Sequence, residues 1–336
     1  MFAYLIRRIL YVPFIILGVT LITFILFNVV GGNPVYQKLG KHGTEADIKN
    51  LEKQLGLDRP LHEQYFFFLS QIVRVTDKES PREITGIEIP ISGSKEIVLF
   101  DFGRSWASHQ KISTMLAAGI GPSLSLALPA FSLSVLLCIL IALLLAFYRR
   151  TPLDKIMVVT CLALMSISML AYIIYFQYFF AYKWDWFPVS GYDSGFIDRW
   201  TYLTLPALIW VITYLGPEVL LYRTIILDEV FQDYVRTARA KGLAEHIVMV
   251  KHVLKNAMIP IITNVLMEIP YLYTGSLLLE SFFGIPGLGG MTVQALNNSD
   301  LPVVKAMTVI GSLLYITFNL ISDICYALVD PRVKLG

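Results

Sequence analysis

Six long apolar runs dominate the chain and most constrain its fold. They cover about residues 9–30, 122–148, 156–182, 200–222, 256–282 and 303–329. A helix needs ~20 apolar residues to cross a hydrocarbon core of ~30 Å, and each run is long enough. The 336 residues are 56% hydrophobic and only 15% charged, whereas a soluble domain is about one quarter charged. We therefore expect an all-α polytopic membrane protein with six transmembrane helices.

The first apolar run follows Arg7 and Arg8, and a basic start of this kind also marks signal peptides. A cleaved signal and a retained transmembrane helix are both open readings. The run stays apolar for about twenty residues, and no small-x-small cleavage site follows it. We expect residues 1–30 to remain as the first transmembrane helix.

Lysine and arginine in the short loops lie mostly on one side of the expected membrane. These residues are Arg7, Arg8, Arg149, Arg150, Lys155, Arg223, Arg236, Arg239, Lys241, Lys251, Lys255, Arg332 and Lys334. The opposite loops, 183–199 and 283–302, hold only Lys183 and Arg199. Because cytoplasmic loops are the basic ones, both termini are expected in the cytoplasm. An aromatic set typical of an outer interfacial belt supports this orientation: Trp184, Trp186, Tyr192 and Trp200.

This orientation places residues 31–116 outside the membrane as one insert. Residues 45–55 and 61–75 have helical patterns, and residues 83–100 alternate as in a short hairpin. We expect a small α+β insert that packs on the membrane part or on a partner, with an unstructured loop as the alternative. The chain then divides into a first helix at 1–30, the insert at 31–116 and a five-helix membrane core at 117–336.

Signatures of catalysis and of nucleotide binding are missing from the sequence. It contains no phosphate-binding G-x-x-x-x-G-K-[ST] loop, no G-x-S-x-G and no H-E-x-x-H. The five histidines and three cysteines, Cys138, Cys161 and Cys325, have no metal-ligand spacing. GIPGLGG at 284–290 follows an apolar run and reads as a tight outer turn or a short re-entrant element. The chain is therefore expected to be no enzyme, to bind no cofactor or metal, and either to be passive or to draw on an ion gradient or another protein.

The basic stretch DYVRTARAKGLAEHIVMVKHVLKNAMIP, residues 233–260, lies between two apolar runs on the cytoplasmic side. A helix from about 229 to 241 would place one group of residues on a common face: Val230, Tyr234, Val235 and Ala238. Gly242 stands where a left-handed residue ends a helix, and Leu243 is placed for the accompanying apolar contact. A second helix would begin near Ala244 and continue into the next apolar run. The whole cytoplasmic helical segment spans about 229–255.

Two functions are open for this segment. A basic amphipathic helix can lie on anionic lipid. It can also project as a rod into a groove of a partner protein. A rigid helix braced by two transmembrane helices would pass a partner's motion to them, which a loose loop would not.

Several motifs of the chain resemble those of ATP-binding-cassette importer permeases of the peptide/nickel branch. They are YLIRRIL at 4–10, FDFGRSWASHQKI at 100–112, DYVRTARAKGL at 233–243, VLKNAMIP at 253–260, LLESFFGIPGLGG at 278–290 and DICYALVDPRVKLG at 323–336. The resemblance runs from end to end and in order. It is closest to the B-type membrane subunit of oligopeptide and dipeptide importers.

The resemblance implies that the cytoplasmic stretch is the coupling helix of a permease. Gly242 and Ala238 match the glycine and second alanine of the family's E-A-A-x-x-x-G signature, while Arg236 and Thr237 replace its first two residues in the branch's manner. The residues implied to meet a separate ATPase are Tyr234, Arg236, Ala238, Arg239, Lys241, Gly242 and Leu243. Glu280 matches an acidic residue before the outer turn, and Asp323 the last intramembrane carboxylate; we interpret both as structural.

Glu218 and Glu268 lie inside apolar runs, next to a Gly-Pro pair and to Pro270. A carboxylate there costs ~2.5–3.5 kcal/mol on insertion scales, so it usually faces a cavity or a partner. We hypothesise that Glu268, with Tyr271 and Tyr273, lines the solute conduit. Glu218 either does the same or pairs with Arg223. A structural bond between helices is the alternative for both carboxylates.

The implied partners are a second homologous permease, two ATPase subunits that use ATP and Mg²⁺, an extracytoplasmic solute-binding protein and the lipid bilayer. A net charge of +2 gives no sign of nucleic acid as a partner. The implied location is the bacterial inner membrane, and the implied solutes are peptides, with nickel chelates, opines and some sugars also carried by this branch. The competing interpretation is an autonomous secondary transporter or channel. An intramembrane enzyme is a third class that lacks a paired nucleophile and base.

Overall fold

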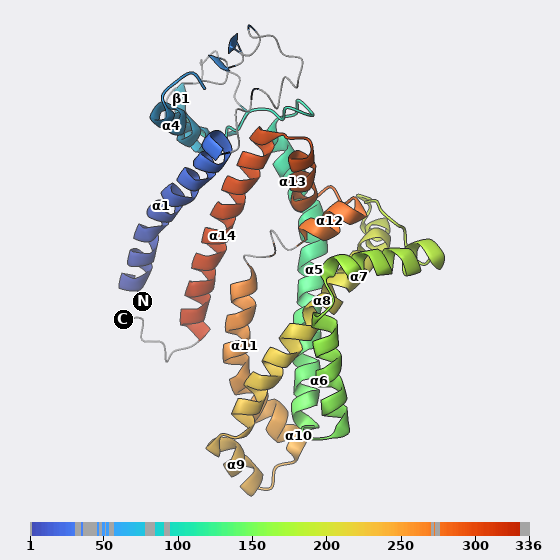
Figure 1. Cartoon of the computed structure of the whole chain (residues 1–336). Coiled ribbons are helices and arrows are strands. Elements are labelled where there is room, and N and C mark those ends of the chain that lie inside the picture. The colour runs from blue at the N-terminus through green and yellow to red at the C-terminus, as the bar shows by residue number, and fades with distance from the viewer. Residues whose placement is uncertain are drawn as a thin grey trace. The chain divides into compact units, whose positions relative to one another are not determined.

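The computed structural model describes residues 2–30, 35, 46, 49–50, 52–53, 57–77, 85–90, 95–269, 272 and 276–329 (Figure 1). These residues are mostly helical. They fall into two compact units, which are treated in turn. We name Ser123–Ile285 with Thr317–Gly336 the core unit, and Phe2–Pro122 with Pro286–Ile316 the second unit.

Within the described residues, four helical stretches are long and apolar enough to cross a membrane. They are Leu10–Asn28, Ile112–Phe147, Ile197–Val230 and Leu301–Ser322. A bent pair, Pro152–Met165 with Met169–Lys183, brings the number to five if the pair is one span. The expected span at 256–282 is described only in part, on either side of residues 270–271 and 273–275. The chain is therefore a multi-pass helical membrane protein, although the number of six spans rests on the sequence.

The span expected over about 156–182 is bent rather than continuous. The structure divides this stretch into α6 (Pro152–Met165) and α7 (Met169–Phe176), which meet at 91°. Two serines explain the break, because serine hydroxyls compete with the backbone for hydrogen bonds. Ser166 Oγ donates to the carbonyl of Leu162 at 2.7 Å, and Ser168 caps α7 by accepting from the amide of Ala171 at 3.4 Å.

The second unit contains α1 (Phe2–Phe24), the π-helical η1 (Ile25–Val30), α4 (Leu61–Ile72) and a small sheet. The strands β1 (Val73–Asp77), β2 (Ile87–Pro90) and β3 (Lys95–Leu99) pair antiparallel in the order β1-β3-β2. Val73 and Ile87 flank Leu99 in the register. The hairpin expectation falls on β2 and β3, whose intervening residues 91–94 lie outside the described residues.

The FDFGRSWAS motif fastens the second unit through two carboxylates. Asp101 accepts from Arg74 Nη2 at 3.0 Å and from the Thr85 amide at 3.2 Å. Asp300, which is buried at the start of α14 (Leu301–Val329), accepts from the Ser105 hydroxyl and from the Trp106 amide at 3.0 Å. The motif thus serves to join the sheet, the following loop and the N-terminus of α14.

The core unit is built on the long helices α5 (Ile112–Phe147) and α8 (Phe196–Val230), with α6 packed along α8. The chain then continues through α9 (Asp233–Ala240), α10 (Glu245–Ile247), the π-helical η4 (Val248–Leu254), α11 (Lys255–Glu268) and α12 (Leu277–Phe283). Within its described residues, one apolar cluster lies at the α9 end and another lies around α7, the π-helical η3 (Gln177–Lys183) and α12. The GIPGLGG stretch forms a turn that starts with Gly284 at φ +65° and leads into α13 (Leu288–Asn297).

Candidate coupling segment and intramembrane carboxylates

The exposed helix α9 (Asp233–Ala240) begins later than the sequence pattern predicts. α8 continues through Val230, and the chain turns at Phe231 before α9 starts at Asp233. Gln232, at φ −69° and ψ 152°, is extended and resets the helix direction. One continuous helix from 229 to 241 is therefore wrong, whereas the end of α9 before Gly242 is confirmed.

The turn at Phe231 also changes which side chains are buried beneath α9. Val235 and Ala238 are buried, and Val230 joins them from the end of α8. Tyr234 is 38% exposed, because the turn at Phe231 removes the four-residue spacing that would align it with Val230. The Tyr234 hydroxyl donates to Glu229 Oε2. Partial burial, together with the nearby Glu229 carboxylate, raises the pKa of Tyr234 to about 12.

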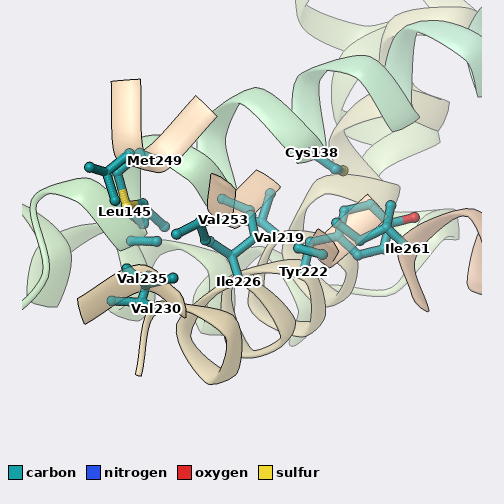
Figure 2. Close-up of a cluster of buried hydrophobic side chains, with 14 of the residues drawn as sticks. Cys138, Leu145, Val219, Tyr222, Ile226, Val230, Val235, Met249, Val253 and Ile261 are labelled. Atoms are coloured by element: carbon teal, nitrogen blue, oxygen red, sulfur yellow. The ribbon is translucent and has the colours of Figure 1, made fainter. Parts of the chain in front are cut away.

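The base of α9 is part of an apolar cluster whose buried residues come from α5, α6, α8, α9, η4 and α11 (Figure 2). Val230 and Val235 lie next to each other, and Leu145 of α5 lies beside Met249 of η4 (Figure 2). The same cluster continues along α8, η4 and α11 through these buried residues: Ile226, Tyr222, Val219, Val253, Ala257 and Ile261. Because close-packed interiors transmit displacement, a movement of α9 would be passed on to α8 and α11.

Gly242 ends α9 in the left-handed region. Its φ is +79°, and no atom lies within 4 Å of the position that a Cβ would take. The strain of a substitution would therefore be conformational rather than steric. A β-carbon in the left-handed region costs about 1 kcal/mol or more, which only glycine avoids.

A forked ion pair closes the turn around Gly242. Arg239 Nε and Nη2 donate to Glu245 Oε2 and Oε1 at 3.0 and 2.7 Å. The hydrogen bonds from Arg239 lower the pKa of Glu245 and raise that of Arg239. This pair joins the last turn of α9 to α10 across the glycine.

The remaining predicted coupling residues are exposed. Arg236, with a side chain 72% exposed, makes a 3.3 Å contact to Asp233, whose side chain is 96% exposed. Lys241 and Leu243 are also exposed, so Leu243 does not bury the contact expected of it. After the extended Ala244, α10, η4 and α11 follow one another without a gap, which confirms the second helix.

Two intramembrane carboxylates lie together in the core unit, and one amide bridges them. Asn264 Nδ2 donates to Glu218 Oε2 at 3.0 Å and to Glu268 Oε1 at 2.9 Å. Glu268 Oε2 is buried without a hydrogen-bond partner among the described residues. Sequence reasoning named both carboxylates but missed Asn264, although its position four residues before Glu268 places it on the same helical face. Tyr271 and Tyr273, predicted to join Glu268, lie outside the described residues.

The alternative pairing of Glu218 with Arg223 is wrong. Arg223 Nε and Nη2 donate to Asp154 Oδ1 and Oδ2, both at 2.8 Å. Asp154 is buried at the start of α6, where Thr151 caps the helix. The sequence carried a signal for this site, because Thr151-Pro152 followed by an acidic residue is typical of a helix start.

Of the two remaining carboxylates named from the sequence, Glu280 and Asp323, the structure describes the side chain of Glu280. Glu280 is buried and accepts from the hydroxyls of Ser123, at 2.8 Å, and Ser276. This geometry fits the structural interpretation, since it joins α12 to α5. The side chain of Asp323 lies outside the described residues. In the second unit, Lys305 donates to Asn28 Oδ1, a contact that sequence reasoning did not name although a lone lysine stands within an apolar run.

A multi-pass helical chain with polar groups inside its apolar helices, and with an exposed helix α9 packed on α8 and η4, fits a membrane transport component. The chain belongs to the family described as binding-protein-dependent transport system inner membrane component, whose model matches residues 138–335. The N-terminal model of the same systems matches residues 1–127. The chain is thus a permease subunit of an ATP-binding-cassette importer.

Relatives with known names cover the whole chain. It is 30% identical over 344 residues to a putative peptide permease protein of Brucella suis biovar 1, with all of both chains covered. It is 32% identical over 337 residues to the dipeptide transport system permease protein DppB of Bacillus subtilis, covering 99% of this chain and 98% of that one. The oligopeptide transport system permease protein AppB of Bacillus subtilis is 30% identical over 340 residues, covering 99% and 100%. These relatives are permeases rather than enzymes.

Proposed function

We propose that this chain and a second, homologous permease form the pathway of an ATP-driven importer for peptides or related small solutes. The support for the solute class is the set of full-length relatives named as peptide, dipeptide and oligopeptide permeases. The observation that carries the mechanism is the exposed helix α9, which stands on a buried cluster shared with α8 and α11. A merely passive pore has no use for such a projection.

α9 and the turn after it dock in a cleft of a separate ATPase subunit, in the helix-in-groove manner. Tyr234, Arg236, Lys241 and Leu243 supply the contact surface, because each is exposed. Ala238 faces the permease core and serves as the seat of the helix. Arg239 and Gly242 act indirectly by fixing the shape of the turn.

The proposed orientation places both termini and α9 in the cytoplasm, with six spans and the insert at 31–116 outside. The excess of lysine and arginine on the α9 side supports it. The membrane is then a bacterial inner membrane, which is supported by the words inner membrane component in the family description and by relatives from Brucella suis and Bacillus subtilis. The solute-binding protein would meet the insert and the outer loops.

The solute pathway includes Glu218 and Glu268, with Tyr271 and Tyr273 nearby in the chain. Glu268 is suited to receive a cation, because one of its oxygens is buried and finds no partner among the described residues. A peptide ammonium group would supply the missing donor. ATP and Mg²⁺ act on the ATPase subunits, and this chain binds neither.

Reconstitution with and without the ATPase subunits tests the proposal. Vesicles that hold the two permeases, the ATPases and the binding protein should accumulate peptide when ATP is inside the compartment that faces α9. A cysteine pair between Arg236→Cys and the ATPase cleft should form a disulfide, whereas Val250→Cys, exposed on η4, serves as the control. Uphill uptake by the permeases alone would favour an autonomous secondary transporter instead.

A further inference from the structure

The segment that follows the bend runs across the direction of the membrane spans. α7 and η3, residues Met169–Lys183, stand at 91° to α6 (Figure 1). α6 packs along α8, which is itself long and apolar enough to cross a membrane. Since α6 crosses the membrane in this arrangement, a segment at 91° to it lies along the membrane plane.

The length of α6 places the bend near a membrane boundary. Its 14 residues extend about 21 Å at 1.5 Å per residue, roughly 9 Å less than the ~30 Å hydrocarbon core. Helices that lie in the interface bury their apolar face ~5–10 Å into the headgroup boundary. A helix that starts at the end of α6 therefore lies at the depth typical of an interfacial helix.

α7 and η3 present two apolar faces of different kinds. The inner face packs into the cluster around α12 through these residues: Tyr172, Ile173, Phe176, Phe180 and Ala181. The outer face is exposed and consists of Leu170, Ile174, Tyr175, Tyr178 and Tyr182. No charged residue occurs between Met169 and Tyr182. A water-facing helix would carry charges on this outer face.

The composition of the outer face matches the boundary between lipid and water. Tyrosine and tryptophan concentrate there, because their rings are apolar while the hydroxyl or indole N–H reaches polar groups. Trp184 and Trp186 follow directly, with ring centroids 4.9 Å apart. Lys183, whose ammonium lies 5.5 Å from the Phe179 ring centre, adds a cation suited to lipid phosphate.

The segment is fastened to the rest of the core unit rather than loosely attached. Gln177 Nε2 donates to the carbonyls of Val189 and Phe282, each at 3.1 Å. The Gly191 amide donates to the carbonyl of Phe283 at 2.8 Å. α7 and η3 are thus held at a fixed angle by bonds to the following loop and to α12.

We propose that α7 and η3 form an interfacial anchor that lies flat against the lipid headgroups, with the tyrosine face in contact with lipid. Its place in the outer leaflet rests on the orientation proposed above. The anchor fixes the depth of the core unit at the end opposite α9, so that force applied at α9 tilts helices instead of moving the whole unit through the bilayer.

Site-directed spin labelling in lipid nanodiscs measures the depth of this segment. Ile174→Cys, Tyr178→Cys and Tyr182→Cys are labelled one at a time in a chain whose own cysteines are replaced by alanine. Oxygen and nickel-chelate accessibilities in phosphatidylcholine–phosphatidylglycerol nanodiscs should give one common depth at the headgroup level for all three. A helix that crosses the membrane would instead spread these positions over about 12 Å, since eight residues separate the first from the last.

Two outcomes overturn the anchor: a spread of that size, or free access of the nickel chelate to all three labels. The latter result would assign the face to water. Thr237→Cys, exposed on α9, should be water-accessible under either outcome and sets the upper limit of nickel-chelate access. Labelling of the same cysteine by a membrane-impermeant maleimide, in intact cells and after lysis, tests the cytoplasmic assignment separately. If a labelled variant does not fold, quenching by headgroup-level and mid-chain nitroxide lipids, compared between the native chain and a Trp184→Phe/Trp186→Phe variant, reports the same depth.

Discussion

Arg223 on α8 donates two parallel hydrogen bonds to Asp154 on α6, each 2.8 Å long. Asp154 also accepts from the backbone amide of Arg150 at 3.1 Å and is itself buried. The pair joins the start of α6 to the half of α8 that leads into α9. It is therefore a polar link between α6 and the helix that leads into α9.

Removal of one partner of this pair should destabilise the core unit more than removal of both. Asp154→Asn leaves the Arg223 guanidinium without its counter-charge, and breaking a buried pair typically costs ~3–5 kcal/mol. The double variant Asp154→Asn/Arg223→Gln should recover part of that loss. Thermal unfolding of the detergent-purified complex gives the comparison, with Asp228→Asn, an exposed position on the same helix, as the control. Equal melting temperatures for Asp154→Asn and the control would show that this ion pair does not stabilise the core unit.

Gly242→Ala should weaken the link between ATP hydrolysis and uptake. The left-handed φ of +79° disfavours any β-carbon, so the turn should lose about 1 kcal/mol or change shape. We expect lower peptide uptake per ATP hydrolysed, with little change in the amount of assembled complex. Gly121→Ala is the matched control, because Gly121 lies within the helix α5, has open space around it and has no positive φ. Indistinguishable coupling ratios in the two variants would show that the turn geometry is not needed.

Glu268→Gln should reduce uptake about tenfold while the complex still assembles. A charge-assisted hydrogen bond contributes ~1.5–3 kcal/mol, and 1.4 kcal/mol corresponds to a factor of ten. Initial uptake rates over a range of peptide concentrations are the measurement, and a rise in KM is expected for loss of a binding contact.

Asn264→Leu helps to distinguish a solute-binding role of Glu268 from a structural one. It removes the bridging amide from both Glu218 and Glu268, so unsatisfied buried oxygens should lower stability by ~1–3 kcal/mol. If Glu268→Gln lowers the melting temperature as much as Asn264→Leu and leaves KM unchanged, Glu268 is a structural residue and not part of the pathway.

The sequence predicts the membrane class well because that prediction depends on the length and polarity of apolar runs alone. The end of α9 before Gly242 is equally local, since only glycine adopts the left-handed conformation at little cost. The start of α9 is less predictable. The apolar spacing of Val230, Tyr234 and Ala238 fits one continuous helix, and only the turn at Phe231 excludes it.

Pairings between distant segments could not be read from the chain in the same way. Arg223 has Glu218 five residues before it, yet its partner is Asp154, which is 69 residues away. The choice depends on how α6 packs against α8, and hydropathy does not encode that contact. The bend at Ser166–Ser168 is a similar case. The apolar residues on both sides favour one continuous helix, whereas the hydrogen bonds of the serine side chains to the backbone favour the bend.

The Arg239–Glu245 pair should be insensitive to pH across the physiological range. The hydrogen bonds from Arg239 lower the pKa of Glu245 in the folded chain. The contribution of the pair is therefore complete above the unfolded glutamate value of about 4.3 and is lost as the pH falls through the lowered folded value. Coupling between ATP hydrolysis and uptake should accordingly be flat from about pH 6 to pH 8.

Glu245→Gln should reproduce at neutral pH the effect of protonation, because it keeps the size of the side chain and removes its charge. The coupling ratio should fall, and Arg239→Gln should lower it by a similar amount, while the double variant should show little further loss. Arg236→Gln is the informative comparison, since Arg236 is open to solvent on the same helix and would meet the ATPase directly. Additive losses for Arg239 and Glu245 would mean that the two side chains act separately and that their ion pair does not shape the turn.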